Sequence, residues 1–190
     1  MNLLLLGPQG SGKGTQAKRL AEEYGLAHVA TGDILRQEIE EGTEFGKQVG
    51  PILASGGLVP DDQMIELIRE RLQQDDAQNG FVLDGFPRTQ AQADALDRML
   101  QEIERPLTVV FALDISDESS KERLLKRAHE EGRDDDTSEV IDRRLRTYHE
   151  QTEPIVEHYR TTGKLVPLHA DRSVEAVWTE IQDALEQVAA

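Results

Sequence analysis

The residues near the start of the chain that are best suited to chemistry form a glycine-rich stretch, GPQGSGKGT at 7–15. Its spacing, with Gly12 and Lys13 following Gly7 after four residues, is typical of loops that bind nucleoside triphosphates. Glycines leave successive backbone N–H groups uncovered, so these groups can converge on a phosphate at the positive end of the following helix. We expect Lys13 to reach the outer phosphates. A glycine-rich turn without a ligand is the alternative, and the lysine and the preceding apolar run argue against it.

One position departs from the usual pattern of such loops. Gly14 stands where a Ser or Thr hydroxyl normally follows the lysine, and the hydroxyl comes one residue later, at Thr15. We therefore expect Mg²⁺ to be held largely through water and the oxygens of the nucleotide. The chain has no cysteine, which excludes disulfides, thiolate catalysis and zinc sites built from cysteine.

Three arginines occupy positions suited to binding further phosphates. Arg36 follows Thr31 near an expected helix N-terminus, where the helix dipole also favours an anion; the alternative is an ion pair with Glu40. Arg88 lies in a rigid turn that suits bidentate phosphate binding, and its alternative is the anchoring of a loop carbonyl. Arg144 falls on the inward face of its predicted helix, so it needs an anionic partner, either a substrate or a buried carboxylate.

Five short apolar runs alternate with amphipathic segments. The runs predict strands at 2–6, 27–30, 81–83, 107–113 and 164–168. Helical spacing and caps predict helices at 13–24, 31–41, 44–54, 60–72, 89–103, 117–129, 137–159 and 174–188, with Thr31 or Asp33 capping the second and Pro154 bending the seventh. This alternation predicts an α/β fold with an open, five-stranded parallel sheet, whose ligands lie at the carboxyl ends of the strands.

Composition limits the class of partner. The chain has 190 residues and a net charge of −16, which argues against nucleic acids and anionic membranes. No apolar run approaches the roughly 20 residues that span a bilayer, and the first strand begins at Asn2, leaving no room for a signal peptide. Each predicted helix has one apolar stripe. We therefore expect a cytoplasmic monomer.

Five stretches together resemble the adenylate kinases: GPQGSGKGTQ at 7–16, TGDILR at 31–36, GGLVPD at 56–61, DGFPRTQAQ at 84–92 and RDDDT at 133–137. They follow the order of that family over nearly the whole chain, and the short stretch at 132–136 is similar to the form with a short lid. The resemblance implies a P-loop three-layer sandwich and the reaction MgATP + AMP ⇌ 2 ADP. It also implies one domain at 1–190, with a core (1–30, 60–127, 138–190), an AMP-binding flap (31–59) and a short lid (128–137).

The resemblance further implies residue roles. It assigns ATP binding to Gly10, Ser11, Gly12, Lys13, Gly14, Thr15, Arg127 and Arg172. It assigns AMP binding to Thr31, Arg36, Gly57, Leu58, Val59, Gly85, Phe86, Pro87, Arg88, Gln92, Arg133 and Arg144. Lys13, Arg88, Arg133 and Arg144 are the implied catalytic residues, and Asp84 is the implied water-mediated metal ligand. A phosphate acceptor is already an anion, so this chemistry needs cations to neutralise charge and no general base.

Several alternatives stay open at this stage. A pyrimidine monophosphate kinase is the nearest one; Thr89 and Gln90, where those kinases carry an Asn, favour AMP. A kinase for small metabolites would need a base, for which Asp84 is the candidate, and a nucleotide-binding switch would form no ADP. Asp84 is alternatively a helix cap, and Arg123 either stacks on adenine or faces solvent. We expect Asp134–Asp136 to cap the following helix, Trp178 to be core, and the five histidines to have no chemical role.

We expect the acidic excess to form a solvated surface. A sharper hypothesis is adaptation to high salt, because dissolved ions screen repulsion between surface carboxylates. We expect the melting temperature to rise as KCl is increased. Thermal unfolding followed by circular dichroism over a KCl series measures this, and a flat or falling curve would rule the adaptation out.

Overall fold

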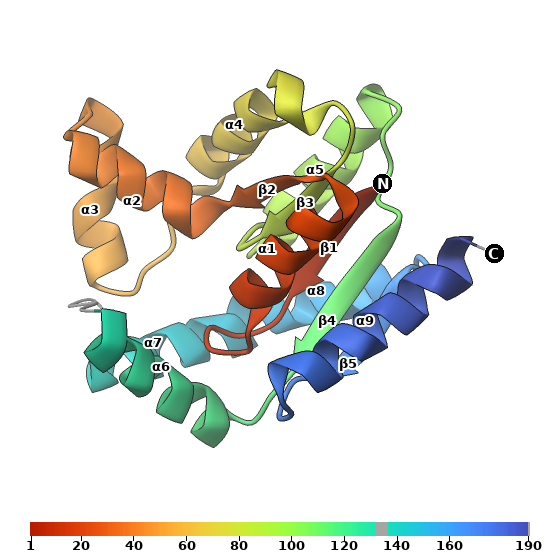
Figure 1. The fold of residues 1–190 in the computed structure, drawn as a ribbon. Coiled ribbons are helices and arrows are strands. Elements are labelled where there is room, and N and C mark those ends of the chain that lie inside the picture. Colours follow the sequence, from red (N-terminus) through yellow and green to blue (C-terminus); the bar gives the residue numbers. More distant parts are fainter. Residues whose placement is uncertain (132–136, 190) are drawn as a thin grey trace.

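The computed structural model of this chain describes residues 1–131 and 137–189. Within them, five parallel strands form one sheet in the order β2-β3-β1-β4-β5 (Figure 1). The strands are β1 (Asn2–Leu6), β2 (Ala27–Ala30), β3 (Phe81–Asp84), β4 (Val109–Asp114) and β5 (Leu165–His169). The predicted α/β fold with a five-stranded parallel sheet is confirmed. Since β1 lies between β3 and β4, the strand order reverses there, which is the point where such sheets bind ligands.

Helices connect the strands. They are α1 (Lys13–Tyr24), α2 (Thr31–Glu41), α3 (Glu44–Ala54), α4 (Asp61–Leu72), α5 (Gln90–Glu102), α6 (Asp117–Glu131), α7 (Ser138–Thr147), α8 (Glu153–Arg160) and α9 (Val174–Ala189), with a 3₁₀ turn η1 (Asp75–Ala77) and a π-helical turn η2 (Tyr148–Thr152). The helix predicted at 137–159 is therefore interrupted by η2, immediately before Pro154, because proline cannot donate the backbone hydrogen bond that continues an α-helix. None of the described helices has the length and apolar character needed to cross a membrane.

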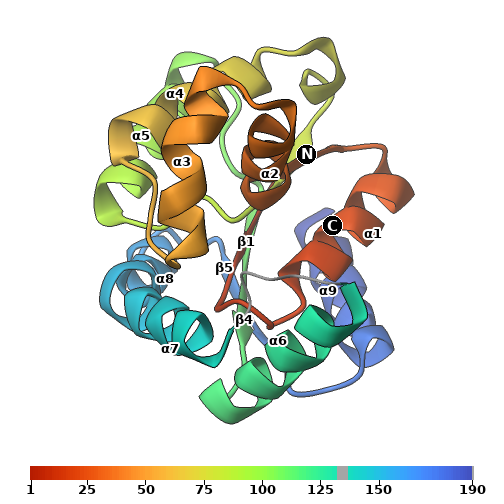
Figure 2. The same cartoon turned by 90° about the vertical axis from the view of Figure 1, so that its left-hand side faces the viewer.

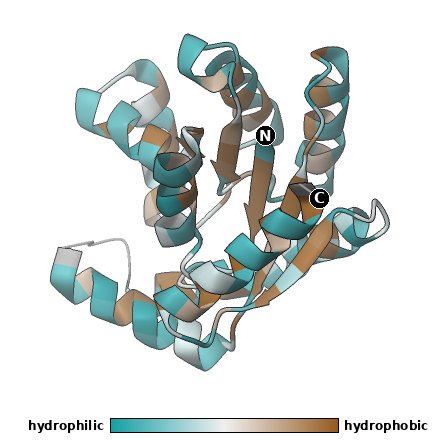
Figure 3. Cartoon of the chain, turned by 45° about the vertical axis from the view of Figure 1, so that its right-hand side comes forward, coloured by the Kyte–Doolittle hydropathy of each residue, from teal (hydrophilic) through white to brown (hydrophobic). Residues whose placement is uncertain are grey.

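The sheet is covered on both faces, which explains its continuous apolar strands. Leu3 and Leu5 of β1 pack with α1 and α9, whereas Leu4 and Leu6 pack with α4, α5 and α8 on the opposite face (Figure 2). Trp178 lies in the first of these cores, as predicted, and is 5% exposed. Figure 3 shows hydrophobic strands inside and hydrophilic outer helix surfaces. Successive strand residues point to opposite faces, so every residue of β1 is buried.

The predicted capping of α2 by Thr31 or Asp33 is wrong. The N-cap is Ala30, because β2 runs directly into α2 and leaves no loop residue to act as a cap. Thr31 Oγ1 instead donates a hydrogen bond of 3.3 Å to the carbonyl of Asp84. The reading of Asp84 as a helix cap is also wrong, since the N-cap of α5 is Thr89.

Residues 31–59 form a pair of helices that stands beyond the edge strand β2 (Figure 1). This segment contributes apolar side chains to the core, because Leu35, Val49 and Val59 are all buried. Helices α2 and α3 meet closely at Gly46. A Cβ built there would lie 2.0 Å from the carbonyl oxygen of Glu38, so only glycine permits this approach.

We therefore expect Gly46→Ala to separate α2 from α3 and to destabilise the chain by about 3 kcal/mol, as overpacking does. Gly50→Ala, on the same helix, is the matched control. Outside its chain neighbours its Cβ would meet only the side chain of Ile39, at 3.8 Å. The gain in helix propensity is opposed by Pro51, which disfavours a helical residue with a Cβ before it, so the net change should stay within about 1 kcal/mol. Urea unfolding and hydrogen exchange in α2 and α3 measure both effects, and equal behaviour of the two variants would contradict the close packing.

Candidate active site

The glycine-rich loop joins the carboxyl end of β1 to α1 and adopts a conformation that few other residues permit. Gly10 and Gly12 have φ angles of 82° and 90°. A Cβ on Gly10 would also lie 2.7 Å from the carbonyl oxygen of Ser120, so this position tolerates no side chain. Gly12 is the N-cap of α1, and no side chain of the described residues caps the first turn. The loop can therefore present backbone N–H groups to an anion, as predicted.

Lys13 bends back over this loop. Its ammonium donates hydrogen bonds to the carbonyls of Gly7, at 2.7 Å, and Pro8, at 2.8 Å. Burial lowers the pKa of Lys13 to about 8; the carboxylate of Asp84 opposes this shift, and the charges of Arg88 and Arg127 add to it. A phosphate beside Lys13 would stabilise its charged form, so lysine protonation and anion binding are linked.

Arg88 is held at three points. Its Nε donates to the carbonyl of Gly85 at 2.8 Å, its backbone N–H donates to Gln92 Oε1 at 2.8 Å, and its carbonyl accepts from Thr152 Oγ1 at 2.9 Å. The predicted alternative of carbonyl anchoring is thus observed through Nε, and it leaves the outer face of the guanidinium for other partners. Burial lowers the pKa of Arg88, and the charges of Arg144 and Arg36 lower it further. These three arginines therefore repel one another across the site.

Arg36 and Arg144 reach the site from opposite sides. Arg36 lies over Gly32 and pairs with Asp33, so its predicted surface partner, Glu40, is not the one observed. Arg144 donates a hydrogen bond of 3.4 Å to the carbonyl of Leu53, which joins α7 to the end of α3. The prediction that Arg144 points inward is confirmed, because it lines the central cavity.

One cavity of about 1130 Å³ contains all but one of the predicted site residues. From the ATP side it is lined by Gly10, Ser11, Gly12, Lys13, Gly14, Thr15, Arg127 and Arg172. From the AMP side it is lined by Thr31, Arg36, Gly57, Leu58, Val59, Gly85, Phe86, Pro87, Arg88, Gln92 and Arg144, and Asp84 lies between the two sets. The remaining residue, Arg133, lies outside the described residues, as do Asp134–Asp136. The cavity exceeds the usual volume for one small ligand, so it suits two.

Two of the residues assigned to AMP binding are buried and already hydrogen-bonded. Gln92 is 2% exposed; beyond its bond to Arg88, its Nε2 donates to Asp61 Oδ1 at 2.8 Å. Thr31 is 1% exposed and bonds to Asp84, as described above. Asp61 was absent from the sequence prediction, yet it also accepts a bond of 2.9 Å from Thr89 Oγ1. Its position at the second residue of the expected helix 60–72 gave no signal of this role, although it ends the GGLVPD stretch.

The arginines at the ATP end differ in their surroundings. Arg123 donates to the carbonyls of Ala170, at 2.9 Å, and Arg172, at 3.4 Å, so the reading of Arg123 as a solvent-facing arginine is wrong. Arg172 pairs with Glu180 at 2.8 Å on the exposed rim of the cavity. Stacking of Arg123 on adenine stays a prediction.

The sequence analysis missed several cavity residues. Both ends of the π-helical turn η2 line the cavity. Its N-cap Thr147 and its first residue Tyr148 do so at one end, and Thr152 does so at the other. His28 of β2 also lines it, and its buried Nε2 has no hydrogen-bond partner among the described residues. Only the proline at 154 signalled an interruption here, and it did not indicate which side chains the turn would expose to the cavity.

The comparisons with known proteins agree with this geometry. A sequence profile of the family described as adenylate kinase matches residues 5–164. A protein named adenylate kinase from Caulobacter vibrioides is 47% identical over the full length of both chains. Another of that name from Stenotrophomonas maltophilia is 45% identical over 98% of this chain and 100% of its own, and one from Archaeoglobus fulgidus is 40% identical over 99% of each.

Nucleotide binding should depend on pH through Lys13. In the free protein this lysine loses its proton near pH 8, whereas a bound phosphate holds the proton. We therefore expect the affinity for ATP to be constant below that pH and to fall by up to about tenfold per pH unit above it. Calorimetric titration with ATP between pH 7 and pH 10 measures the slope.

The variant Lys13→Arg is the control, since a guanidinium keeps its charge to about pH 12 and beyond. Its affinity for ATP should show no such decline, whatever its absolute value. A wild-type affinity that is unchanged across this range would show that Lys13 does not hold the phosphates.

Proposed function

The chain belongs to the adenylate kinase family, and from this premise we propose which of its residues carry the transfer of the terminal phosphoryl group of ATP to AMP. It is an enzyme, an ATP:AMP phosphotransferase, and the reaction it catalyses, ATP + AMP ⇌ 2 ADP, balances the adenine nucleotides. The assignment of residues rests on one observation: the phosphate-binding loop lines the same cavity as Arg36, Arg88 and Arg144.

The ATP phosphates bind to the glycine-rich loop and Lys13. Backbone N–H groups at the start of α1 surround the phosphates, and Lys13, which in the free protein bonds to loop carbonyls, turns its ammonium to the outer phosphates. Arg127 and Arg172 line the same end of the cavity. The exchange of neutral carbonyl partners for an anion raises the pKa of Lys13 and strengthens binding.

The phosphate of AMP binds to Arg88 and Arg36, and Arg144 contacts the phosphoryl group during transfer, with Arg133 as its companion from the lid. The mutual repulsion of Arg36, Arg88 and Arg144 supports this, because a phosphate placed among them removes it. The attacking oxygen already carries negative charge, so the residues position the two nucleotides and neutralise them without a general base.

The residues of the cavity fit a magnesium ion that is held mainly by water and the nucleotide. The described residues contain no cluster of three or more potential ligands, but Asp84 Oδ2 lies 3.4 Å from the Cβ position of Gly14, at the start of α1. Mg²⁺ characteristically retains several waters and uses few carboxylates. Asp84 would hold the ion through water, and the ion would supply charge neutralisation and orient the phosphate oxygens.

Two segments close over the nucleotides: the AMP-binding flap (31–59) and the short lid (128–137). A site open to water would hydrolyse ATP, so closure before transfer favours the acceptor over water. The bond between Arg144 and the carbonyl of Leu53 supports contact between the flap and α7. We propose that the enzyme works as a monomer in the cytoplasm, where ATP and AMP are available, and that it binds neither nucleic acid nor membrane.

The choice of acceptor nucleotide distinguishes an adenylate kinase from a UMP or CMP kinase. No observation favours the UMP or CMP kinase. We expect MgATP with AMP to give ADP rapidly, whereas UMP, CMP and GMP should give at least about tenfold lower turnover, because we assign Gln92 and Thr31, which line the cavity, to recognition of the base. A coupled assay with each monophosphate in turn measures this. Turnover with UMP or CMP equal to that with AMP would contradict the assignment.

The cations are tested by substitution. Lys13→Met and Arg88→Ala should each lower kcat by about a hundredfold or more, because each removes charge stabilisation from the transition state. Arg98→Ala, on the exposed side of α5, removes the same charge away from the cavity and should leave kcat unchanged. Circular dichroism and melting curves confirm that each variant folds. Near-normal turnover by either folded site variant would show that the residues are wrongly assigned.

A further inference from the structure

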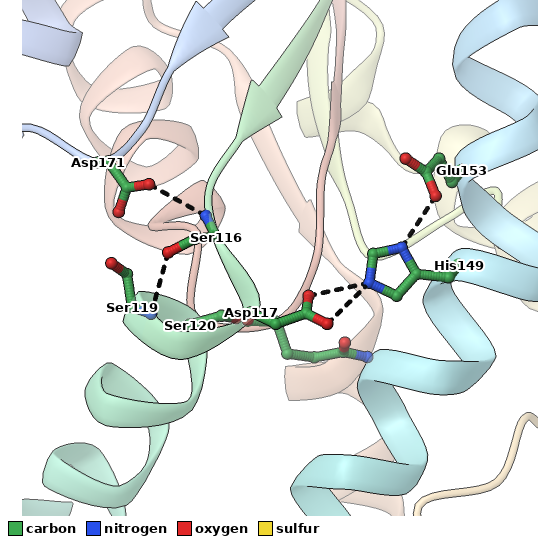
Figure 4. Close-up of polar contacts among 8 residues, drawn as sticks. Ser116, Asp117, Ser119, Ser120, His149, Glu153 and Asp171 are labelled. Atoms are coloured by element: carbon green, nitrogen blue, oxygen red, sulfur yellow. Dashed lines mark hydrogen bonds and ion pairs between the residues drawn. The ribbon is translucent and has the colours of Figure 1, made fainter.

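His149 lies outside the cavity, at the point where η2 faces the start of α6. Its Nδ1 is 2.8 Å from Glu153 Oε2, and its Nε2 is 2.9 Å from Asp117 Oδ1 and 3.1 Å from Asp117 Oδ2 (Figure 4). Both ring nitrogens therefore face carboxylates. A neutral imidazole has a single N–H, so one of its nitrogens would present a lone pair to a carboxylate. Only the imidazolium donates both hydrogen bonds, and the geometry thus requires the protonated form.

The surroundings of His149 stabilise its charge. Glu153 and then Asp117, through their hydrogen bonds, raise the pKa of His149 above its usual value. These are the charged groups that face the imidazole among the described residues, one from its own segment and one from α6; the ring of Tyr148 meets it edge-on. A second ion pair, at 2.7 Å, joins Lys121 of α6 to Asp142 of α7, the helix that precedes η2.

These ion pairs matter because α6 and α7 share little apolar surface. The cluster that joins them consists of Leu124, Ile141 and Leu145, and it is separate from the two cores of the sheet. Helices with so small a common core depend more on polar contacts for their relative position.

The two elements that His149 links, α6 and η2, each make hydrogen bonds to segments that line the cavity. At the start of α6, the N–H of Ser116 donates to Asp171 Oδ2 at 3.0 Å (Figure 4), and Ser120 Oγ donates to the carbonyl of Gln9 in the phosphate-binding loop. At the end of η2, Thr152 holds the carbonyl of Arg88. His149 therefore links α6, which contacts the phosphate-binding loop through Ser120, to η2, which contacts the backbone of Arg88 through Thr152.

We propose that His149 is a positioning residue for phosphoryl transfer: as an imidazolium it ties α6 to η2 and so fixes Arg127, on α6, relative to Arg144, on α7. The proposal rests on the proposed function for the roles of those two arginines. Because the pKa of His149 is raised in the folded protein, the tie is complete below about pH 6.5, the ordinary value, and is lost as the pH rises through the raised value.

The chain offers a matched control in His158. Its Nε2 is 2.8 Å from Asp97 Oδ2, and its Nδ1 is 3.1 Å from Gln90 Nε2. The neutral imidazole satisfies both contacts, by donating to Asp97 and accepting from Gln90. A substitution at His158 therefore removes hydrogen bonds of a neutral histidine, and it removes no hydrogen bond that requires the imidazolium.

The experiment compares the wild type with His149→Gln, His158→Gln and Asp117→Asn between pH 6 and pH 9. We expect the ratio of wild-type kcat to His149→Gln kcat to be about three at pH 6 and to approach one at pH 9, the scale expected of a half-exposed ion pair. The ratio cancels the contribution of Lys13, which both proteins share. The difference in melting temperature should fall over the same range, and NMR titration of the imidazole should give the same midpoint.

The other variants sharpen the test. His158→Gln should give a kcat ratio that does not change with pH. Asp117→Asn introduces an amide that can donate to a neutral His149, so the tie should persist at high pH. Its kcat should equal that of the wild type at pH 6 and exceed it by up to about threefold at pH 9.

The proposal would be overturned if the kcat ratio for His149→Gln did not change with pH, or if His158→Gln showed the same pH dependence. It would also be overturned if the difference in melting temperature changed with pH while kcat did not. Titration of the His149 imidazole at the ordinary pKa would likewise contradict it. These results differ from those expected if the proposed function itself is wrong. In that case the wild type forms no ADP from ATP and AMP, while the NMR titration and the melting comparison still decide whether the tie exists.

Discussion

Positive charges held close together are the constraint on which the rest of this structure depends. Burial lowers the pKa of both Arg88 and Lys13, and nearby cations lower them further: Arg144 and Arg36 act on Arg88, and Arg88 and Arg127 act on Lys13. Asp84 is the carboxylate that opposes both shifts. A chain with a net charge of −16 has thus kept most of its carboxylates out of one cavity. Under the proposed function, bound phosphate groups would relieve this repulsion, so the free energy spent on assembling the cations would add to the affinity for the substrates.

The fold holds Lys13 and Arg88 with neutral acceptors, whereas Arg36 pairs with Asp33. Lys13 bonds to the carbonyls of Gly7 and Pro8, and Arg88 bonds to that of Gly85. A carbonyl fixes the direction of a cationic side chain without cancelling its charge, whereas a carboxylate would compete with the phosphate. At the rim the arrangement changes, since Arg172 pairs with Glu180. The strength of the electrostatic site therefore comes from backbone that the parallel sheet positions rigidly.

The two sides of the cavity have different mechanical support. The phosphate-binding loop and the turn before Arg88 follow β1 and β3, which are buried on both faces of the sheet. Helices α6 and α7 have only a small apolar cluster between them and rely on ion pairs at Asp117 and Lys121. Lys13 and Arg88 therefore lie shortly after buried strands, whereas Arg127 and Arg144 lie on helices that share a small apolar cluster and surface ion pairs, which salt weakens.

The sequence by itself determined the α/β fold, the five strands, nearly all helix boundaries and the cavity residues that belong to contiguous motifs. These features are local, because apolar periodicity, glycine turns and the spacing around Lys13 act within a few residues. Only the tertiary structure decided the partner of each polar side chain. Thr31 bonds to Asp84 instead of capping α2, Gln92 is shared between Arg88 and Asp61, and His149 meets Asp117 from a segment 32 residues away. A hydrogen bond depends on which distant segment comes within reach, and that is fixed by the packing of the helices on the sheet, which no local pattern encodes.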